Sequence, residues 1–269
     1  MNYYVLGRTP TFVYSMRRTG SVSLFNAVKA RGVFAIATHN LNPDLPPGIR
    51  VSGSGRWAME KIVRRRKPAK LISLVRNPFD TMASVFAKSS FDAAIVTGQA
   101  EEYARQQRSA DELGRQFIEN YLKNDRYLEQ LAWFESEYRP ALGIEVYNHP
   151  FDKQRGFARI DEGPYSALIL KTELDDASKA SLVGEFLGLR DFQMLPPDEV
   201  AYPTYKTGFT PGIPGTQAPY GADYERLKSG LTIPEEYWNN IVNSRFARHF
   251  FTSEELAASR SKLVGSPSN

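Results

Sequence analysis

Between residues 11 and 23 the chain carries the side chains that an anion-binding site needs. An apolar run, 11–15, leads into a turn rich in Arg, Gly, Ser and Thr, and an amphipathic segment with helical spacing follows. The first amides of a helix have no partner inside the helix, and the helix dipole places a partial positive charge beside them. The residues expected to surround a phosphate or sulfate there are Arg17, Arg18, Thr19, Gly20, Ser21, Val22 and Ser23. The alternative is an ordinary turn between strand and helix with solvated arginines.

A second basic turn follows the apolar run 70–75. Arg76 stands directly after this run, and Ser84 lies two helical turns farther along, on an expected helix over 79–88. A guanidinium can bind phosphate oxygens through two parallel hydrogen bonds, so Arg76 and Ser84 together would suit a phosphate monoester. Two anion-binding turns, each behind a strand, predict a ligand with two separate phosphate groups.

The segments that must position these turns alternate between strand-like and helix-like, which predicts a parallel sheet. The expected strands are 11–15, 33–38, 70–75, 144–148 and 167–173. The expected helices are 21–31, 55–66, 79–88, a charged helical stretch over 100–139, 178–187 with Gly188 as its C-cap, 234–246 and 253–262. The carboxyl ends of parallel strands meet at one edge of the sheet, where α/β proteins place their sites.

These segments fit one α/β domain over residues 1–269, with its core over about 11–262. Its expected architecture is three-layered, α/β/α, with a central parallel sheet flanked by helices. A Pro- and Gly-rich stretch, 201–221, is expected to form a long loop, and the last residues, 265–269, a frayed tail.

Composition excludes several classes of protein. A formal net charge of +4 suits an anionic ligand but is too weak to predict nucleic-acid binding. The chain has no cysteine, so it forms neither disulfides nor thiolate metal sites. The first residues do not have the pattern of a signal peptide, and no apolar run approaches the length of a membrane span. We therefore expect a cytoplasmic protein.

The two basic turns carry a family resemblance. Arg18-Thr19-Gly20-Ser21 resembles the 5′-phosphosulfate loop of sulfotransferases that use 3′-phosphoadenosine-5′-phosphosulfate (PAPS). The segment from Arg76 to Ser84 resembles the one with which they grip the 3′-phosphate of this donor. Shorter stretches are similar to the bacterial capsular polysaccharide synthesis family, which is itself sulfotransferase-like; they are 38–41, 147–157, 170–174 and 249–255.

The resemblance spans about residues 11–262 and implies a P-loop-like fold and a PAPS-dependent sulfotransferase. It further implies that PAPS is the donor, that no metal is required, and that the acceptor is a hydroxyl of a carbohydrate or small natural product. One departure is the loop that covers the adenosine in many cytosolic sulfotransferases. It has no clear copy here, and 205–208 is the nearest candidate.

Three residues are the candidates for catalysis. Sulfuryl transfer resembles phosphoryl transfer, in which positioning and charge stabilisation dominate. Arg18 is expected to stabilise the leaving phosphate, and His39, after strand 33–38, to act as general base because its pKa lies near neutrality. The alternative for His39 is a hydrogen bond that only holds a loop. Glu173 would orient the base, bind the acceptor or cap the next helix.

Two further residues, His149 and Asp152, are candidate acceptor contacts, although their loop could be purely structural. Two other functions also fit the pattern. A nucleotide-dependent kinase or other phosphotransferase would use a similar sheet, but the chain has no Gly-Lys pair and so no G-x-x-x-x-G-K-[ST] signature. A non-catalytic nucleotide-binding relative would keep the pocket without turnover. The stretch 53–58 matches G-x-G-x-x-A after a very short apolar run, so it is expected to begin helix 55–66 instead.

Overall fold

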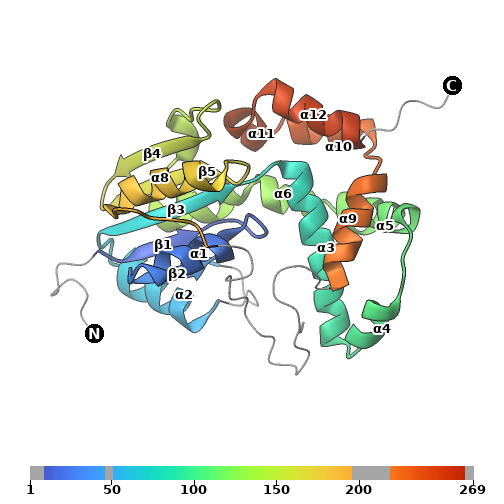
Figure 1. Ribbon diagram of the computed structural model, residues 1–269, viewed down its shortest axis with the longest axis horizontal. Coiled ribbons are helices and arrows are strands. Elements are labelled where there is room, and N and C mark those ends of the chain that lie inside the picture. Colours follow the sequence, from blue (N-terminus) through green and yellow to red (C-terminus); the bar gives the residue numbers. More distant parts are fainter. Residues whose placement is uncertain (1–8, 46–50, 196–218, 264–269) are drawn as a thin grey trace. The chain divides into compact units, whose positions relative to one another are not determined.

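The computed structural model describes residues 9–45, 51–195 and 219–263. The chain divides into two compact units. The first comprises Met1–Arg76 and Ala132–Pro196, and the second comprises Asn77–Leu131 and Pro197–Asn269. The described strands all belong to the first unit, and the described elements of the second unit are helices (Figure 1).

One five-stranded sheet forms the centre of the first unit. Its strands are β1 (Thr11–Tyr14), β2 (Ala35–Thr38), β3 (Ala69–Val75), β4 (Phe157–Glu162) and β5 (Tyr165–Lys171), in the order β2-β1-β3-β5-β4. β1 pairs in parallel with β2 and β3, and β3 pairs in parallel with β5. Only β4 runs antiparallel. The α/β class and the predicted central, mostly parallel sheet are therefore confirmed.

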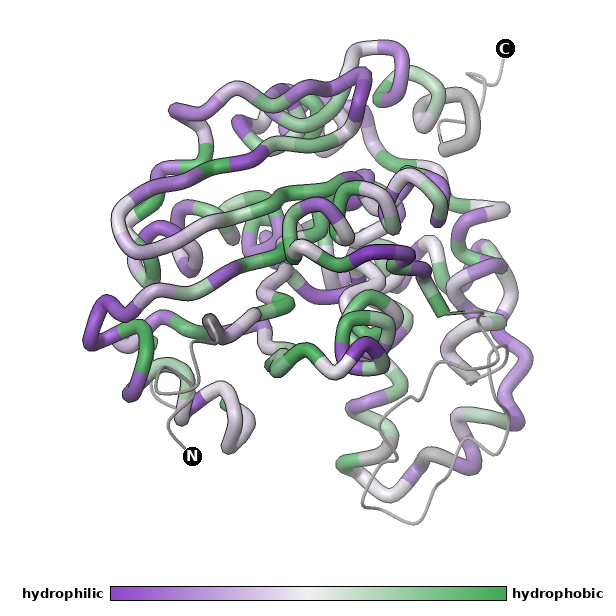
Figure 2. Tube along the Cα trace, turned by 60° about the vertical axis from the view of Figure 1, so that its left-hand side comes forward, coloured by the Kyte–Doolittle hydropathy of each residue, from purple (hydrophilic) through white to green (hydrophobic). Residues whose placement is uncertain are grey.

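Apolar residues of the strands form the core of this unit. Figure 2 marks the hydrophobic stretches of the chain in green. On one face of the sheet, α1 (Ser21–Ala30) and α8 (Asp176–Leu187) pack against a buried cluster that includes Val13, Ile72 and Leu168. Because side chains alternate along a strand, Tyr14 lies on the opposite face. Its ring stacks on Tyr138, with centroids 5.3 Å apart.

The ends of α8 follow the expected capping rules. Asp175 accepts a hydrogen bond from the amide of Ser178, and Gly188 ends the helix in the left-handed conformation with φ 72°. Glycine adopts that conformation without the steric penalty of a Cβ, which is why it is frequent at this position. The predicted C-cap at Gly188 is thus confirmed.

The remaining short helices of the first unit connect the strands. They are α2 (Gly53–Ala58), η2 (Met59–Val63), η4 (Phe134–Tyr138), α7 (Arg139–Leu142) and η5 (Val146–Asn148). The predicted strand 144–148 is wrong, because the amides of Asn148 and His149 bond back to Glu145 and Val146 and close a 3₁₀ turn.

Strand β4 was not predicted from the sequence. Its burial alternates, with Ala158 and Ile160 inside and Arg159 and Asp161 outside. Such an edge strand contains few apolar residues, so its apolar signal is weak. A two-residue turn at 163–164 then leads into β5, and Gly163 has the positive φ, 57°, that this turn needs.

The second unit is built from α3 (Pro78–Val96), α4 (Ala100–Arg105), α5 (Ala110–Phe117), η3 (Ile118–Leu122), α6 (Arg126–Leu131), α9 (Pro219–Gly230), α10 (Glu235–Val242), α11 (Arg245–Phe250) and α12 (Ser253–Leu263). Pro78 occupies the first turn of α3, as expected. The single helix predicted over 234–246 is instead two helices. α10 ends before Ser244, which caps α11 by accepting a hydrogen bond from the amide of Ala247.

Buried contacts hold the helices of the second unit together. Phe79 stacks on Trp238 with ring centroids 4.3 Å apart. Asp223, which is almost fully buried, binds Arg108 at 2.6 Å and Arg226 at 3.0 Å. Three sequence predictions lie outside the described residues: the candidate adenosine loop 205–208, the tail 265–269 and most of the loop 201–221. The single-domain organisation stays a prediction.

Candidate functional site

The carboxyl ends of four parallel strands carry most of the candidate residues. Ser15 follows β1, His39 follows β2, Arg76 follows β3, and Thr172 follows β5. These strands are neighbours in the sheet, so the four residues lie along one edge. The structure therefore places the predicted anion loop, the predicted base and the predicted 3′-phosphate arginine on the same edge of the first unit.

Side chains from the three neighbouring strands hold the loop after β1 by its carbonyl oxygens. His39 Nδ1 donates to the Ser15 carbonyl over 2.6 Å. Arg76 Nη1 donates to the Arg18 carbonyl over 3.0 Å, and Thr172 Oγ1 donates to the Thr19 carbonyl over 2.8 Å. In a trans peptide the carbonyl and the next amide point in opposite directions. Fixing these carbonyls therefore turns the following amides, including that of Gly20, away from the three side chains.

The start of helix α1 leaves its first amides available. Gly20 is its N-cap in the left-handed conformation, φ 81°, and no side chain caps the helix. Within the described part of the chain, the amides of Gly20, Ser21, Val22 and Ser23 make no hydrogen bond. By contrast, Asp175 and Ser244 cap α8 and α11. The N-terminus of α1 thus keeps its hydrogen-bond donors for a group outside the helix.

The two arginines of the loop are at its surface. Arg17 is exposed and Arg18 is half-buried. Arg18 has φ 65°, a left-handed backbone that costs a non-glycine residue about 1 kcal/mol or more. The hydroxyl of Thr19, in contrast, points back into the loop and donates to the Met16 carbonyl over 3.0 Å, and its side chain is fully buried. Thr19 therefore shapes the loop, while Arg17 and Arg18 supply its charge.

His39 has a defined tautomer when it is neutral. A carbonyl oxygen can only accept, so the bond to Ser15 requires the proton on Nδ1 and leaves the lone pair on Nε2. Burial lowers the pKa of His39 below its usual 6.5, and the positive charges of Arg17 and Arg18 lower it further, against a raising effect of the Ser15 hydrogen bond. The imidazole is therefore neutral at neutral pH, with Nε2 ready to accept a proton.

Glu137 is an important residue that the sequence reasoning missed. It is buried in η4, and its Oε1 accepts hydrogen bonds from Tyr14 Oη at 2.8 Å and from the amides of Leu41 and Asn42 at 2.5 and 2.8 Å. This carboxylate holds the segment just after His39 against β1. The available signal was a pair of carboxylates, Glu135 and Glu137, in an aromatic-rich stretch, 133–138, where a buried charge needs partners.

Two small residues that were also missed lock β1 to β3 at the loop. Ser15 Oγ accepts from the amide of Leu74 at 2.8 Å, and Ser73 Oγ donates to the Tyr14 carbonyl at 2.6 Å. Both side chains are completely buried. The signal for them was a serine within or directly after a mostly apolar strand. They fix where the loop leaves the sheet.

The two candidate acceptor residues, His149 and Asp152, lie at different edges of the sheet. His149 Nε2 lies 2.8 Å from Glu162, which pairs with the first residue of β5, so His149 belongs to the opposite edge of the sheet. The structure does not bring it together with the loop. Asp152 lies nearer the carboxyl edge, because it bridges to Phe157. Its Oδ1 accepts from the amides at 154 and 155 and so shapes its own turn.

Glu173 lies in an exposed turn two residues after β5, not within the strand as predicted. One of its three predicted roles, capping the next helix, is wrong, because Asp175 caps α8. Ser84 is buried in α3 and belongs to the second unit. Its role beside Arg76 stays a prediction.

The G-x-G-x-x-A stretch begins a helix, as expected. Ser52 caps α2 by accepting a hydrogen bond from the amide of Gly55. A Cβ on Gly55 would come within 3.0 Å of the Thr38 hydroxyl, so this glycine allows α2 to approach β2 closely. Gly55 therefore has a packing role, whereas a Cβ on Gly53 would meet nothing within 4 Å.

No protein-family model, curated protein or solved structure matches the chain. Among the described residues, no helix is both long enough and apolar enough to cross a membrane.

Proposed function

We propose that this protein is a sulfotransferase that moves a sulfuryl group from PAPS to a hydroxyl of a carbohydrate or small natural product. The observation that carries the proposal is the loop after β1, whose carbonyls are fixed by His39, Arg76 and Thr172 while the first amides of α1 make no hydrogen bond within the described chain. The resemblance of 18–21 and 76–84 to the phosphate-binding segments of sulfotransferases supports it. With it we propose the P-loop-like, three-layer fold and a cytoplasmic location.

The residues present are chemically suited to this donor. The amides of 20–23 and the guanidinium groups of Arg17 and Arg18 would hold its 5′-phosphosulfate end. The guanidinium of Arg76, which also donates to the Arg18 carbonyl, would bind the 3′-phosphate. When bound, PAPS supplies a sulfuryl group on a phosphate leaving group, and no metal enters the proposal.

His39 would act on the acceptor. Its Nε2 would take the proton that the acceptor hydroxyl loses as the new oxygen–sulfur bond forms. The Ser15 carbonyl would stabilise the resulting imidazolium through the bond to Nδ1. Arg18 would offset the negative charge that builds up on the leaving phosphate. Glu173 and Asp152 would be left for binding the acceptor.

The test is transfer from sulfur-labelled PAPS to a panel of glycans and hydroxylated natural products. We expect labelled product that disappears in His39→Ala, while this variant still binds adenosine 3′,5′-bisphosphate. Binding without turnover on any acceptor would favour the non-catalytic relative. Labelled transfer from ATP with magnesium instead would contradict the proposal in favour of a phosphotransferase.

A further inference from the structure

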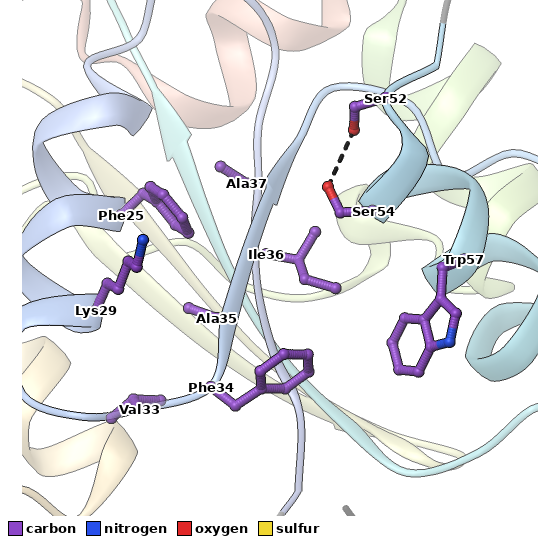
Figure 3. A pocket seen from close by; sticks show the side chains of 10 residues that line it. All are labelled: Phe25, Lys29, Val33, Phe34, Ala35, Ile36, Ala37, Ser52, Ser54 and Trp57. Carbon is purple, nitrogen blue, oxygen red and sulfur yellow. Dashed lines mark hydrogen bonds between the residues drawn. The ribbon is translucent and has the colours of Figure 1, made fainter. Parts of the chain in front are cut away.

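The open edge of the sheet in the first unit carries a groove. β2 is the first strand in the sheet order, and β1 is its only partner among the described strands. Beside it lies a hollow of about 660 Å³, a volume usual for binding sites. Figure 3 shows that β2 runs through its middle. The lining residues are Phe25, Lys29, Val33, Phe34, Ala35, Ile36, Ala37, Ser52, Ser54 and Trp57.

The floor of the groove offers backbone hydrogen-bonding groups. The carbonyls of Phe34 and Thr38 accept from the amides of Thr11 and Ser15, so these residues point their backbone groups at β1. Backbone groups alternate in direction along a strand, so the amides and carbonyls of Ala35 and Ala37 point out of the sheet. Within 9–45, 51–195 and 219–263, nothing pairs with them. An unpaired edge of this kind is a template for one more strand.

Each wall of the groove combines an aromatic side chain with a polar one. Ala35 and Ala37 face Phe25 and Lys29 of α1, whereas Ile36 faces Ser54 and Trp57 of α2 (Figure 3). Alternate side chains of an added strand would enter these two walls in turn. The alanines leave room on one side, and the Trp57 ring, which meets Phe34 edge to face at 6.2 Å, offers an aromatic surface on the other.

The charged residues of the two helices that line the groove are all positive. Lys29 is exposed and is the one ionisable residue among the described residues that line the groove. Neither α1 nor α2 contains an acidic residue, and α2 adds the exposed Arg56. The nearest carboxylate along the chain, Glu60 in η2, is already paired with Arg64 at 3.3 Å. The groove therefore complements a negatively charged occupant.

We propose that the β2 edge binds an extended, acidic peptide segment of another protein by strand addition. Ala35 and Ala37 would exchange backbone hydrogen bonds with it. Phe25 and Trp57 would receive its alternate apolar side chains, and Lys29 would pair with a carboxylate. A second copy of this chain is the less favourable occupant. Pairing β2 with the β2 of a second copy would bring the positive Lys29 and Arg56 of one copy toward the same two positive residues of the other. The proposal is independent of the transfer reaction.

The experiment is a binding titration with a labelled synthetic octapeptide, blocked at both ends, that alternates valine with threonine and contains one glutamate. We expect saturable binding, and loss of binding when the same peptide is N-methylated at alternate amides. Ala37→Pro should weaken binding by about tenfold or more, because it removes an outward amide that β1 does not use. Ala37→Ser keeps the amide and should bind normally.

Charge reversal gives a second, independent arm. The Lys29→Glu variant should no longer bind the acidic peptide and should instead bind the same peptide with lysine in place of glutamate. Because Lys29 is exposed, this substitution should not affect folding. Circular dichroism and thermal unfolding check each variant. The proposal is overturned if no peptide binds, or if binding survives both Ala37→Pro and Lys29→Glu. It is also overturned if sedimentation shows a wild-type dimer that Ala37→Pro makes monomeric.

Discussion

His39 combines a fixed orientation with a lowered pKa. The hydrogen bond from Nδ1 to the Ser15 carbonyl sets the tautomer, and burial with the nearby Arg17 and Arg18 favours the neutral ring. We therefore expect the acid limb of the pH profile for transfer to have its midpoint below 6.5, measured as kcat/KM against pH. A midpoint at or above 6.5 would contradict this reading of His39.

The same shift makes stability depend on pH. The pKa of this histidine is near 6.5 in the unfolded chain and lower in the folded chain, so the unfolded chain binds more protons between these values. The contribution of His39 to stability is fully present above 6.5 and is lost as the pH falls through the folded pKa. Acidification should therefore lower the melting temperature of the wild type more than that of His39→Gln. Parallel curves for the two proteins would count against the burial of a neutral ring.

A third prediction at this scale concerns Arg18. Its left-handed backbone would strain an alanine, so Arg18→Asn is the cleaner substitution because asparagine tolerates this conformation. We expect turnover to fall by about a hundredfold or more, as for the loss of one group that stabilises transition-state charge. Arg17→Ala, at the exposed neighbour, is the matched control and should retain more activity. Equal activity in Arg18→Asn and the wild type would remove Arg18 from the site.

At the scale of elements, the end of β5 supports the loop through one hydroxyl. Thr172→Val keeps the shape of the side chain but removes its hydrogen bond to the Thr19 carbonyl. We expect a loss of about 1 kcal/mol in the free energy of unfolding and weaker binding of adenosine 3′,5′-bisphosphate. Thr172→Ser keeps the hydroxyl and should behave like the wild type. Unchanged ligand binding in Thr172→Val would show that the loop does not depend on β5.

The elements predicted well are those with a strong apolar signal. β3 and β5 are nearly continuous apolar runs, and β1 leads directly into a Gly-containing turn, so their presence follows from the sequence. β4 gives no strong sequence signal because it buries only one of its faces. The apolar residues of 144–148 predict a strand, but buried apolar residues also occur in a 3₁₀ turn, which is what forms there.

The candidate site was predictable in part for a related reason. Ser15, His39, Arg76 and Thr172 each stand just after a strand, and parallel strands bring such positions to one edge. The hydrogen bonds of His39, Arg76 and Thr172 to loop carbonyls depend on side-chain geometry, which no sequence pattern encodes. Glu137 lies 98 positions after His39 (137 − 39), so its hold on Leu41 and Asn42 is visible only in the folded chain.

For the molecule as a whole, Glu137 connects segments that are far apart in the sequence. Its buried Oε1 accepts from Tyr14 on β1 and from two amides after β2. Glu137→Gln keeps the size but removes the charge, and we expect a loss of about 1–3 kcal/mol in unfolding free energy, measured by urea titration. Tyr14→Phe removes one donor of the three and should cost less. A Glu137→Gln protein as stable as the wild type would contradict this role.

The central claim is that two turns of the chain hold the two ends of one doubly phosphorylated adenosine. Isothermal titration calorimetry with adenosine 3′,5′-bisphosphate tests it most directly, with adenosine 5′-monophosphate as the comparison. We expect the wild type to bind the bisphosphate more tightly than the monophosphate, and Arg76→Ala to lose this difference. Equal affinity for the two nucleotides, or a preference for ATP with magnesium, would contradict the claim.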